Sequence, residues 1–166
     1  LREEGNAEAA IKIHQSLTVR PNLSNEIKRE IHKSLALDFE QANQLAKARR
    51  EAELVLKLDK KNLWGNEFLL TIFEQQRDWD KATQMSKTIQ RINQSQDPSQ
   101  IARFLVYQGM DKHERGDHAE AITTFQKAVK IAPEFGLPYL RLGDLYAETR
   151  DLVKAIEYWE KFALLN

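Results

Sequence analysis

Side chains that could bind a metal or act as nucleophiles are few in this sequence of 166 residues and stand far apart. Four histidines are present: His14, His32, His113 and His118. They lack the His-Glu-x-x-His spacing of a helical zinc site, and the absence of cysteine excludes thiolate metal sites, disulfides and a cysteine nucleophile. Asp111, His113 and Glu114 lie close together in the sequence. At the polar end of an expected helix, they are better explained as a solvated charged cluster.

Phosphate-binding and nucleophile motifs are absent from the sequence as well. The six glycines form no phosphate-cradling loop, and no Gly-Lys-Ser or Gly-Lys-Thr occurs. No serine stands in the strand-turn-helix context of a nucleophile elbow. We therefore expect no catalytic residue, no bound metal and no cofactor in this chain.

The charge of the chain argues against two further classes of protein. Lysine plus arginine and aspartate plus glutamate each number 25, so the net charge is zero. A nucleic-acid-binding surface needs clustered excess base to release counterions, and a polybasic membrane-surface module needs the same excess. The longest uncharged runs fall short of the roughly 18–20 apolar residues of a membrane span. We expect neither a nucleic-acid partner nor direct membrane contact from these residues.

The elements that must position any functional side chain are indicated by an internal repeat. Five segments align without gaps, and each places a turn residue five positions before a small alanine. The alanines are Ala10, Ala48, Ala82, Ala121 and Ala155, with spacings of 38, 34, 39 and 34 residues. The turn residues are Gly5, Asn43, Arg77, Gly116 and Arg150. One helical hairpin cannot bury its apolar stripe alone, so such repeats gain stability by stacking on their neighbours.

The last two repeats resemble tetratricopeptide repeats almost position by position. The fifth repeat carries Tyr139, Leu142, Gly143, Tyr146, Ala155 and Trp159 at the places of the family pattern. The fourth repeat carries Leu105, Gly109, Gly116, Ala121, Phe125, Ala128 and Pro133. The resemblance implies an all-α, right-handed superhelical solenoid of about four and a half helical hairpins. On this resemblance, residues 1–166 form a single array, with a partial repeat at 1–28 and further repeats at 29–62, 63–101, 102–135 and 136–166.

Several local features refine this interpretation. Gly143 and Ala155 are expected where two helices approach closely, because a larger side chain would hold the backbones apart. Extra residues within 18–28 and 94–101 are polar and turn-rich, so we expect lengthened links between repeats there. Gly5 is expected to cap the end of a helix whose body is missing. We therefore expect the sequence to be a fragment of a longer protein.

Tetratricopeptide arrays present a concave groove lined mainly by the first helix of each hairpin, which implies a protein or peptide partner. Counting the groove positions along the first helices gives the candidate partner-binding residues Lys33, Trp64, Glu67, Phe68, Arg103, Tyr107, Met110, Arg141 and Asp144. Aromatic residues, methionine and arginine are the types enriched in the cores of protein interfaces.

A chaperone-adaptor role can be tested against the same positions. Members of this family that bind chaperone tails hold a C-terminal carboxylate with a clamp of lysine, asparagine and arginine on three successive first helices. The matching places hold Lys33, Leu37, Phe68, Arg103 and Tyr107 over repeats two to four, and Glu67, Thr71, Tyr107, Leu137 and Arg141 over repeats three to five. Because neither set can make the clamp, the sequence disfavours a chaperone adaptor.

The first half of the chain resembles the lipopolysaccharide assembly protein B family more closely than a generic repeat. The resemblance rests on the Ala-Ile-x-Ile-His-Gln-x-Leu core at 10–17 and the Asp-Trp-x-Lys-Ala run at 78–82, with longer links in the same places. That family is a bacterial scaffold with an N-terminal membrane anchor, a cytoplasmic array and a C-terminal rubredoxin-like metal domain. It regulates lipopolysaccharide biosynthesis by bringing the lipid A-committing deacetylase to a membrane protease.

The resemblance implies a non-enzymatic adaptor whose array is cytoplasmic, with any tether to the inner membrane lying outside this fragment. Two alternatives stay open: a generic tetratricopeptide scaffold in secretion, pilus assembly or a regulatory complex, and the regulatory array of a larger enzyme. A homodimer is also among the expected states, because the exposed ends of an array can pair with themselves.

Overall fold

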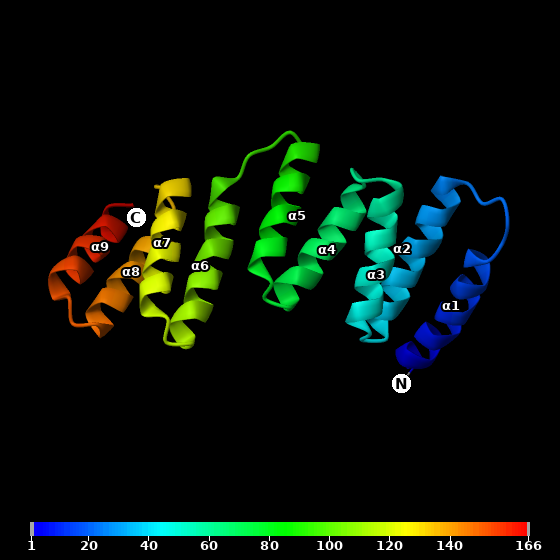
Figure 1. Ribbon diagram of the computed structural model, residues 1–166, viewed down its shortest axis with the longest axis horizontal. Helices are drawn as coiled ribbons and strands as arrows, with labels where there is room; N and C mark the ends of the chain where they lie inside the picture. The colour runs from blue at the N-terminus through cyan, green and yellow to red at the C-terminus, as the bar shows by residue number, and fades with distance from the viewer. Residues whose placement is uncertain (1, 166) are drawn as a thin grey trace. The chain divides into compact units, whose positions relative to one another are not determined.

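The structure, a computed structural model, describes residues 2–165 (Figure 1), and within this range it is all-helical, which confirms the all-α fold class. The described residues form nine successive helices: α1 (Arg2–Thr18), α2 (Asn25–Gln41), α3 (Leu45–Leu58), α4 (Leu63–Gln75), α5 (Trp79–Ile92), α6 (Pro98–Glu114), α7 (His118–Ile131), α8 (Leu137–Glu148) and α9 (Leu152–Leu165). The ends of the predicted array, Leu1 and Asn166, lie outside the described residues.

The contacts between helices divide the chain into two compact units. The first unit ends at Gln76 and contains α1 to α4, and the second begins at Arg77 and contains α5 to α9. This division falls inside the predicted third repeat, 63–101, whose two helices belong to different units. A single array over 1–166 therefore stays a prediction, and each unit is described by itself.

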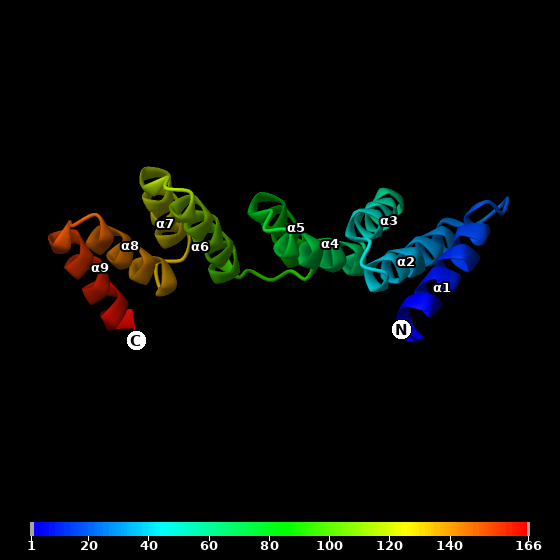
Figure 2. The same cartoon turned by 90° about the horizontal axis from the view of Figure 1, so that it is seen from below.

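In the first unit, each helix packs on the next one along the chain. α2 contacts both α1 and α3, and α3 contacts α4 (Figures 1 and 2). The core contains Leu35 and Ala36 of α2 together with Ala48 and Ala52 of α3, all of them buried. Small side chains on the facing stripes of α2 and α3 allow the two helices to lie close together.

The second unit contains two helical hairpins, α6 with α7 and α8 with α9, and α5 packs on α6. α8 contacts both helices of the hairpin before it, which is how stacked hairpins bury a shared stripe. The core between them contains Val106, Ala121, Phe125 and Leu142, each exposed by 2% or less. The apolar stripes predicted from the sequence therefore face one another.

The turns between paired helices confirm four of the five aligned turn residues. Asn43, Arg77, Gly116 and Arg150 all have φ between 55° and 87°, the left-handed conformation that ends a helix and reverses the chain. The fifth prediction, a helix end at Gly5, is wrong because α1 runs without interruption from Arg2 to Thr18. A glycine inside a helix costs about 1 kcal/mol but does not by itself end the helix.

The two segments predicted to be lengthened links, 18–28 and 94–101, are partly helical, because α2 begins at Asn25 and α6 at Pro98. α2 and α6 have 17 residues each, against 13 in α4 and 12 in α8, so most of the extra residues form an additional helical turn. The Ser24 side chain accepts a hydrogen bond from the Ile27 amide at 3.2 Å, and Asp97 accepts one from the Gln100 amide at 3.2 Å. These caps start the helices before the predicted repeat boundaries at 29 and 102.

The close approach predicted at Gly143 and Ala155 is present, and Gly109 and Ala121 make an equivalent one in the preceding hairpin. A Cβ atom built on Gly109 would lie 2.5 Å from Cε1 of Phe125, and one built on Gly143 would collide with the indole ring of Trp159. Ala121 and Ala155 are completely buried at the same hairpin interfaces. These small residues are therefore fixed by the space between the paired helices.

Candidate functional site

Three of the four candidate residues in the first unit come together on one surface. The Lys33 ammonium on α2 lies 5.4 Å from the centre of the Trp64 ring on α4. That ring stacks on Phe68, one helical turn further along α4, with 4.9 Å between ring centres. We call Lys33, Trp64 and Phe68 the Trp64 cluster. Trp64 is half-buried and Phe68 is buried, while Glu67 is exposed on the same helix.

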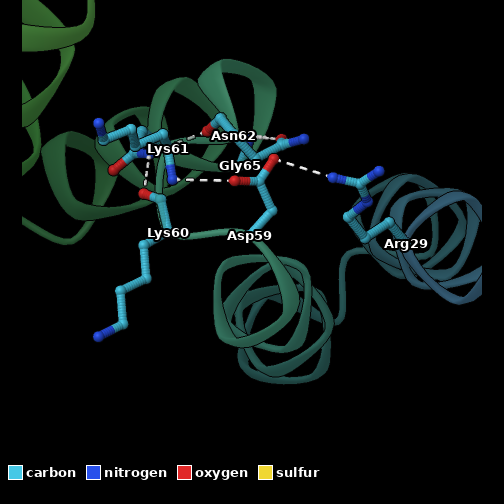
Figure 3. Close-up of polar contacts among 7 residues, drawn as sticks. Arg29, Asp59, Lys60, Lys61, Asn62 and Gly65 are labelled. Atoms are coloured by element: carbon cyan, nitrogen blue, oxygen red, sulfur yellow. Dashed lines mark hydrogen bonds and ion pairs between the residues drawn. The ribbon is translucent and has the colours of Figure 1, made fainter. Parts of the chain in front are cut away.

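The start of α4, which sets the position of Trp64, is held by asparagine side chains. The Asn62 carboxamide oxygen accepts a hydrogen bond from the Gly65 amide at 2.8 Å and caps the helix (Figure 3). The buried Asn66 side chain donates to the backbone carbonyls of Asn62 at 2.9 Å and Lys60 at 3.3 Å. The Asn62 carbonyl also accepts a bond from the Asn66 backbone amide at 3.2 Å, so Asn66 holds this carbonyl with both its backbone and its side chain.

A carboxylate joins the link between α3 and α4 to the preceding hairpin helix. Asp59 accepts a hydrogen bond from the Lys61 amide at 3.2 Å and pairs with the Arg29 guanidinium on α2 at 2.9 Å (Figure 3). Gly65 is packed so closely that a Cβ atom there would lie 2.8 Å from Leu56 Cδ2 of α3. The position of Trp64 relative to α2 and α3 is therefore set from both sides.

In the second unit, two of the five candidate residues lie against aromatic rings. The Arg103 guanidinium lies 5.6 Å from the centre of the Phe135 ring. The Tyr107 ring lies 5.0 Å from the ring of Trp79, which also stacks on Phe104 at 5.9 Å. Tyr107 is half-buried and Arg103 is exposed, so both side chains are accessible to solvent.

The other three candidates, Met110, Arg141 and Asp144, line one pocket of about 170 Å³ in the second unit. His113, Glu114, Phe125, Leu145 and Glu148 complete its lining. Pockets for cofactors and other small molecules usually measure about 300–1,000 Å³. This pocket is smaller than that range and has room for about one side chain.

Polar contacts fix the charged side chains of this pocket. The Arg141 guanidinium lies 3.9 Å from the Asp144 carboxylate, which also accepts a hydrogen bond from the Trp159 indole at 3.1 Å. The Nε atom of Arg141 is buried and lacks a hydrogen-bond partner among the described residues. Asp144 is therefore held by both hairpin helices of the last repeat.

Sequence reasoning missed a polar network at the start of the second unit. Asp111 on α6 forms an ion pair with Arg77 and accepts a hydrogen bond from the Trp79 indole at 2.8 Å. Burial works against ionisation of Asp111, but the hydrogen bonds from Arg77 and Trp79 outweigh it and lower the pKa of the carboxyl group. The only available signal was the separation of Arg77 from Asp111 by 34 residues, one repeat period.

Neither a metal site nor a membrane-spanning helix was expected in this chain. Among residues 2–165, no group of three or more histidine and acidic side chains is arranged to hold a metal ion. Asp111, which stands beside His113 and Glu114 in the sequence, is engaged by Arg77 and Trp79 instead. None of the described helices combines the length and apolar composition needed to cross a membrane.

The nine candidate residues divide between the two units. Each unit brings three of them together: the Trp64 cluster in the first, and the Met110, Arg141 and Asp144 pocket in the second. A continuous concave groove through all nine stays a prediction.

Comparisons with known proteins agree with the repeat register. A family model described as tetratricopeptide repeat matches residues 112–135. Lipopolysaccharide assembly protein B of Haemophilus influenzae is 26% identical over 147 residues, which cover 87% of this chain and 36% of that protein. Heat shock protein STI1 of Saccharomyces cerevisiae is 26% identical over 118 residues, which cover 67% of this chain and 18% of that protein. The chain thus spans little more than a third of the first relative and less of the second.

A solved structure shares the fold over most of the chain. The structure of MamA AMB-1 aligns with a TM-score of 0.50 at 16% identity and covers 97% of this chain and 83% of that one. The match of the repeat model to residues 112–135 and the helical hairpins in the predicted register support the prediction of a tetratricopeptide repeat protein.

Proposed function

We propose that this protein is a non-catalytic scaffold that binds a protein or peptide partner through the first helices of its hairpins. The observation that carries the proposal is the convergence of Met110, Arg141 and Asp144, chosen for their repeat positions, on one pocket the size of a side chain. The half-buried Trp64, with Lys33 over its ring, gives the first unit a second surface of the same kind. Aromatic and arginine anchors in such pockets often dominate the binding free energy of an interface.

The more specific proposal is an adaptor in the regulation of lipopolysaccharide synthesis. It is supported by the similarity to lipopolysaccharide assembly protein B, which covers 87% of this chain. In this role the array brings the lipid A-committing deacetylase to a membrane protease at the cytoplasmic face of the bacterial inner membrane. A homodimer belongs to the same proposal and is measured by light scattering during gel filtration.

The alternative is a tetratricopeptide scaffold for another assembly, such as secretion, pilus assembly, a regulatory complex or the control of a larger enzyme. A chaperone-adaptor role is not favoured despite the similarity to heat shock protein STI1. Of the five clamp places over repeats two to four, Lys33 and Arg103 lie over aromatic rings, while Leu37, Phe68 and Tyr107 carry no charge.

The test is a binding assay of this chain with the lipid A-committing deacetylase and with the membrane protease, each purified. One variant per surface separates the two sites: Trp64→Ala for the first unit and Arg141→Ala for the second. Tyr158→Ala on α9 is the matched control, because this half-buried aromatic residue lies outside the candidate positions. Circular dichroism must first show that each variant keeps its helices.

The expected result is binding by the parent and the control, with at least tenfold weaker binding by one of the surface variants, about 1.4 kcal/mol or more. Binding of neither protein, with capture of another assembly factor from a Gram-negative lysate, favours the generic scaffold. Equal binding by all variants contradicts the proposed surfaces.

A further inference from the structure

The turn between α6 and α7 brings two histidines into direct contact. His113 lies in the last turn of α6 and His118 is the first residue of α7, and their Nδ1 atoms are 3.0 Å apart. Gly116 makes this possible, because its φ of +87° reverses the chain between the two helices. Backbone bonds from the Gly116 amide to the His113 carbonyl and from the Asp117 amide to the Lys112 carbonyl, both 2.9 Å, hold the turn.

A third side chain fixes the proton on one of these imidazole rings. The Nε2 atom of His113 lies 3.1 Å from a carboxylate oxygen of Glu148 on α8. An ionised carboxylate only accepts hydrogen bonds, so Nε2 of His113 carries the proton and Nδ1 of a neutral ring keeps its lone pair. His118 then donates from its own Nδ1. One proton therefore lies between two nitrogen atoms that are both metal ligands when deprotonated.

The two nitrogens lie close enough for one metal ion to take the place of that proton. With metal–nitrogen bonds of about 2.0–2.1 Å, two nitrogens on one ion lie about 3.0 Å apart at an angle near 90° and about 3.4 Å apart at the tetrahedral angle. The 3.0 Å separation is that of an N–H···N hydrogen bond, and small rotations of the rings reach either geometry. Imidazole suits Cu²⁺, Ni²⁺ and Zn²⁺, and among these Cu²⁺, which prefers tetragonal coordination, binds most tightly.

We propose that His113 and His118 form a two-imidazole binding site for a divalent transition-metal ion of tetragonal geometry, with Cu²⁺ bound most tightly. Both Nδ1 atoms bind the ion, the His118 proton moves to its Nε2 atom, and water completes the coordination. The His118 side chain is exposed, so an ion reaches the site from solvent. Glu148 positions His113 through Nε2, as carboxylates do behind many metal-bound histidines.

The first experiment titrates Cu²⁺ into the chain without an affinity tag, followed by calorimetry and by electron paramagnetic resonance. His118→Gln removes one ligand but keeps an N–H group that can donate to His113 Nδ1, so the turn is preserved. His32→Gln is the matched control, because His32 is also partly buried and hydrogen-bonded to a carboxylate, that of Glu51 at 2.6 Å.

The expected result is one bound Cu²⁺ with an axial spectrum and two-nitrogen coupling in the parent and in His32→Gln. In His118→Gln the two-nitrogen signal disappears, and in Glu148→Gln the affinity falls by about tenfold or more. An unchanged affinity and spectrum in His118→Gln would overturn the proposal, as would the absence of a bound ion in the parent. In that case the contact between the two rings is a hydrogen bond that closes the turn.

Discussion

Single glycines fix how closely the helices of each hairpin can approach in the second unit. Gly109 and Gly143 occupy the same repeat position, and each lies against an aromatic ring sixteen residues further along the chain. The two rings differ in their freedom to move, because Phe125 is 2% exposed and Trp159 is 37% exposed. The same substitution is therefore expected to have different costs at the two positions.

Gly109→Ala is expected to destabilise the second unit by about 1–3 kcal/mol, because the new methyl group overlaps a ring that has no space to shift. In Gly143→Ala, movement of Trp159 relieves the overlap, and the higher helix propensity of alanine offsets about 1 kcal/mol of the remaining cost. Urea denaturation of both variants measures the difference. A loss of stability in Gly143→Ala equal to or greater than that in Gly109→Ala would contradict this explanation.

Arg150 and Gly116 both adopt the left-handed conformation that ends a helix, and substitutions at the two positions should have opposite effects on stability. Arg150 adopts a φ of 64°, which costs a non-glycine residue about 1–2 kcal/mol. Arg150→Gly removes this strain but makes the unfolded chain more flexible, so we expect a net stabilisation of about 0.5–1 kcal/mol. Gly116→Ala is expected to have the opposite sign. Thermal denaturation checks both variants, and a lower melting temperature for Arg150→Gly would show that the arginine side chain contributes more than its backbone conformation costs.

At the scale of helices, the first turn of α4 depends on one buried side chain. Asn66 is 1% exposed and its amide donates to two carbonyls of the α3–α4 link. Asn66→Ala removes the side-chain donor from both carbonyls, although the Asn62 carbonyl keeps its bond from the Asn66 backbone amide. We expect a loss of about 1–3 kcal/mol. Because Trp64 lies on the same turn, its fluorescence should shift to longer wavelength. Asn25→Ala, at an exposed position at the start of α2, is the control and should change neither property.

Asp111 is expected to make the packing of α5 on α6 depend on pH. Its pKa lies below the ordinary value of 3.8, since its hydrogen bonds to Arg77 and Trp79 outweigh the effect of burial. The stabilisation by the carboxylate is therefore complete above pH 4 or so and is lost as the pH falls through the lower pKa of the folded state. Asp111→Asn should lower the stability at pH 7 and weaken its decrease on acidification. Parallel stability curves for the parent and the variant between pH 7 and pH 3 would refute this.

The positions of the helices could be predicted wherever a residue type at its place in the repeat fits only one structural role. Buried alanines at Ala48, Ala82 and Ala121 mark close helix contacts, and a repeat period is visible without any knowledge of side-chain conformations. The extra turns of α2 and α6 were missed because Ser24 and Asp97 fit a polar link as well as a helix cap. Gly5 was misjudged for a similar reason, since glycine occurs both at helix ends and inside helices.

The candidate surfaces could be predicted only as far as repeat positions determine them. Met110, Arg141 and Asp144 share a pocket because they occupy equivalent faces of α6 and α8, which the repeat register already specifies. His113 and Glu148 also line that pocket, but their contact depends on side-chain conformations that the sequence does not encode locally. The Arg77–Asp111 pair was missed for the same reason.

At the scale of the whole molecule, the two units each have a core of their own. The first contains Leu35, Ala48 and Ala52, and the second contains Val106, Phe125 and Leu142, all buried. In repeat proteins, stability is approximately the sum of terms for single repeats and for contacts between neighbours. A destabilising substitution in the core of one unit should therefore raise the hydrogen-exchange rates of the amides in that unit first.

Hydrogen exchange measured by mass spectrometry can test this expectation with the Gly109→Ala variant. Amides of α6, α7 and α8 should exchange faster than in the parent, because their shared core contains Phe125 and Leu142. Amides of α2 and α3, whose contacts lie within the first unit, should keep their protection. Asn66→Ala should produce the reverse pattern, with faster exchange in the first unit alone. If either substitution raised exchange equally from α1 to α9, the chain would unfold as one cooperative body, and the division at Gln76 would have no thermodynamic counterpart.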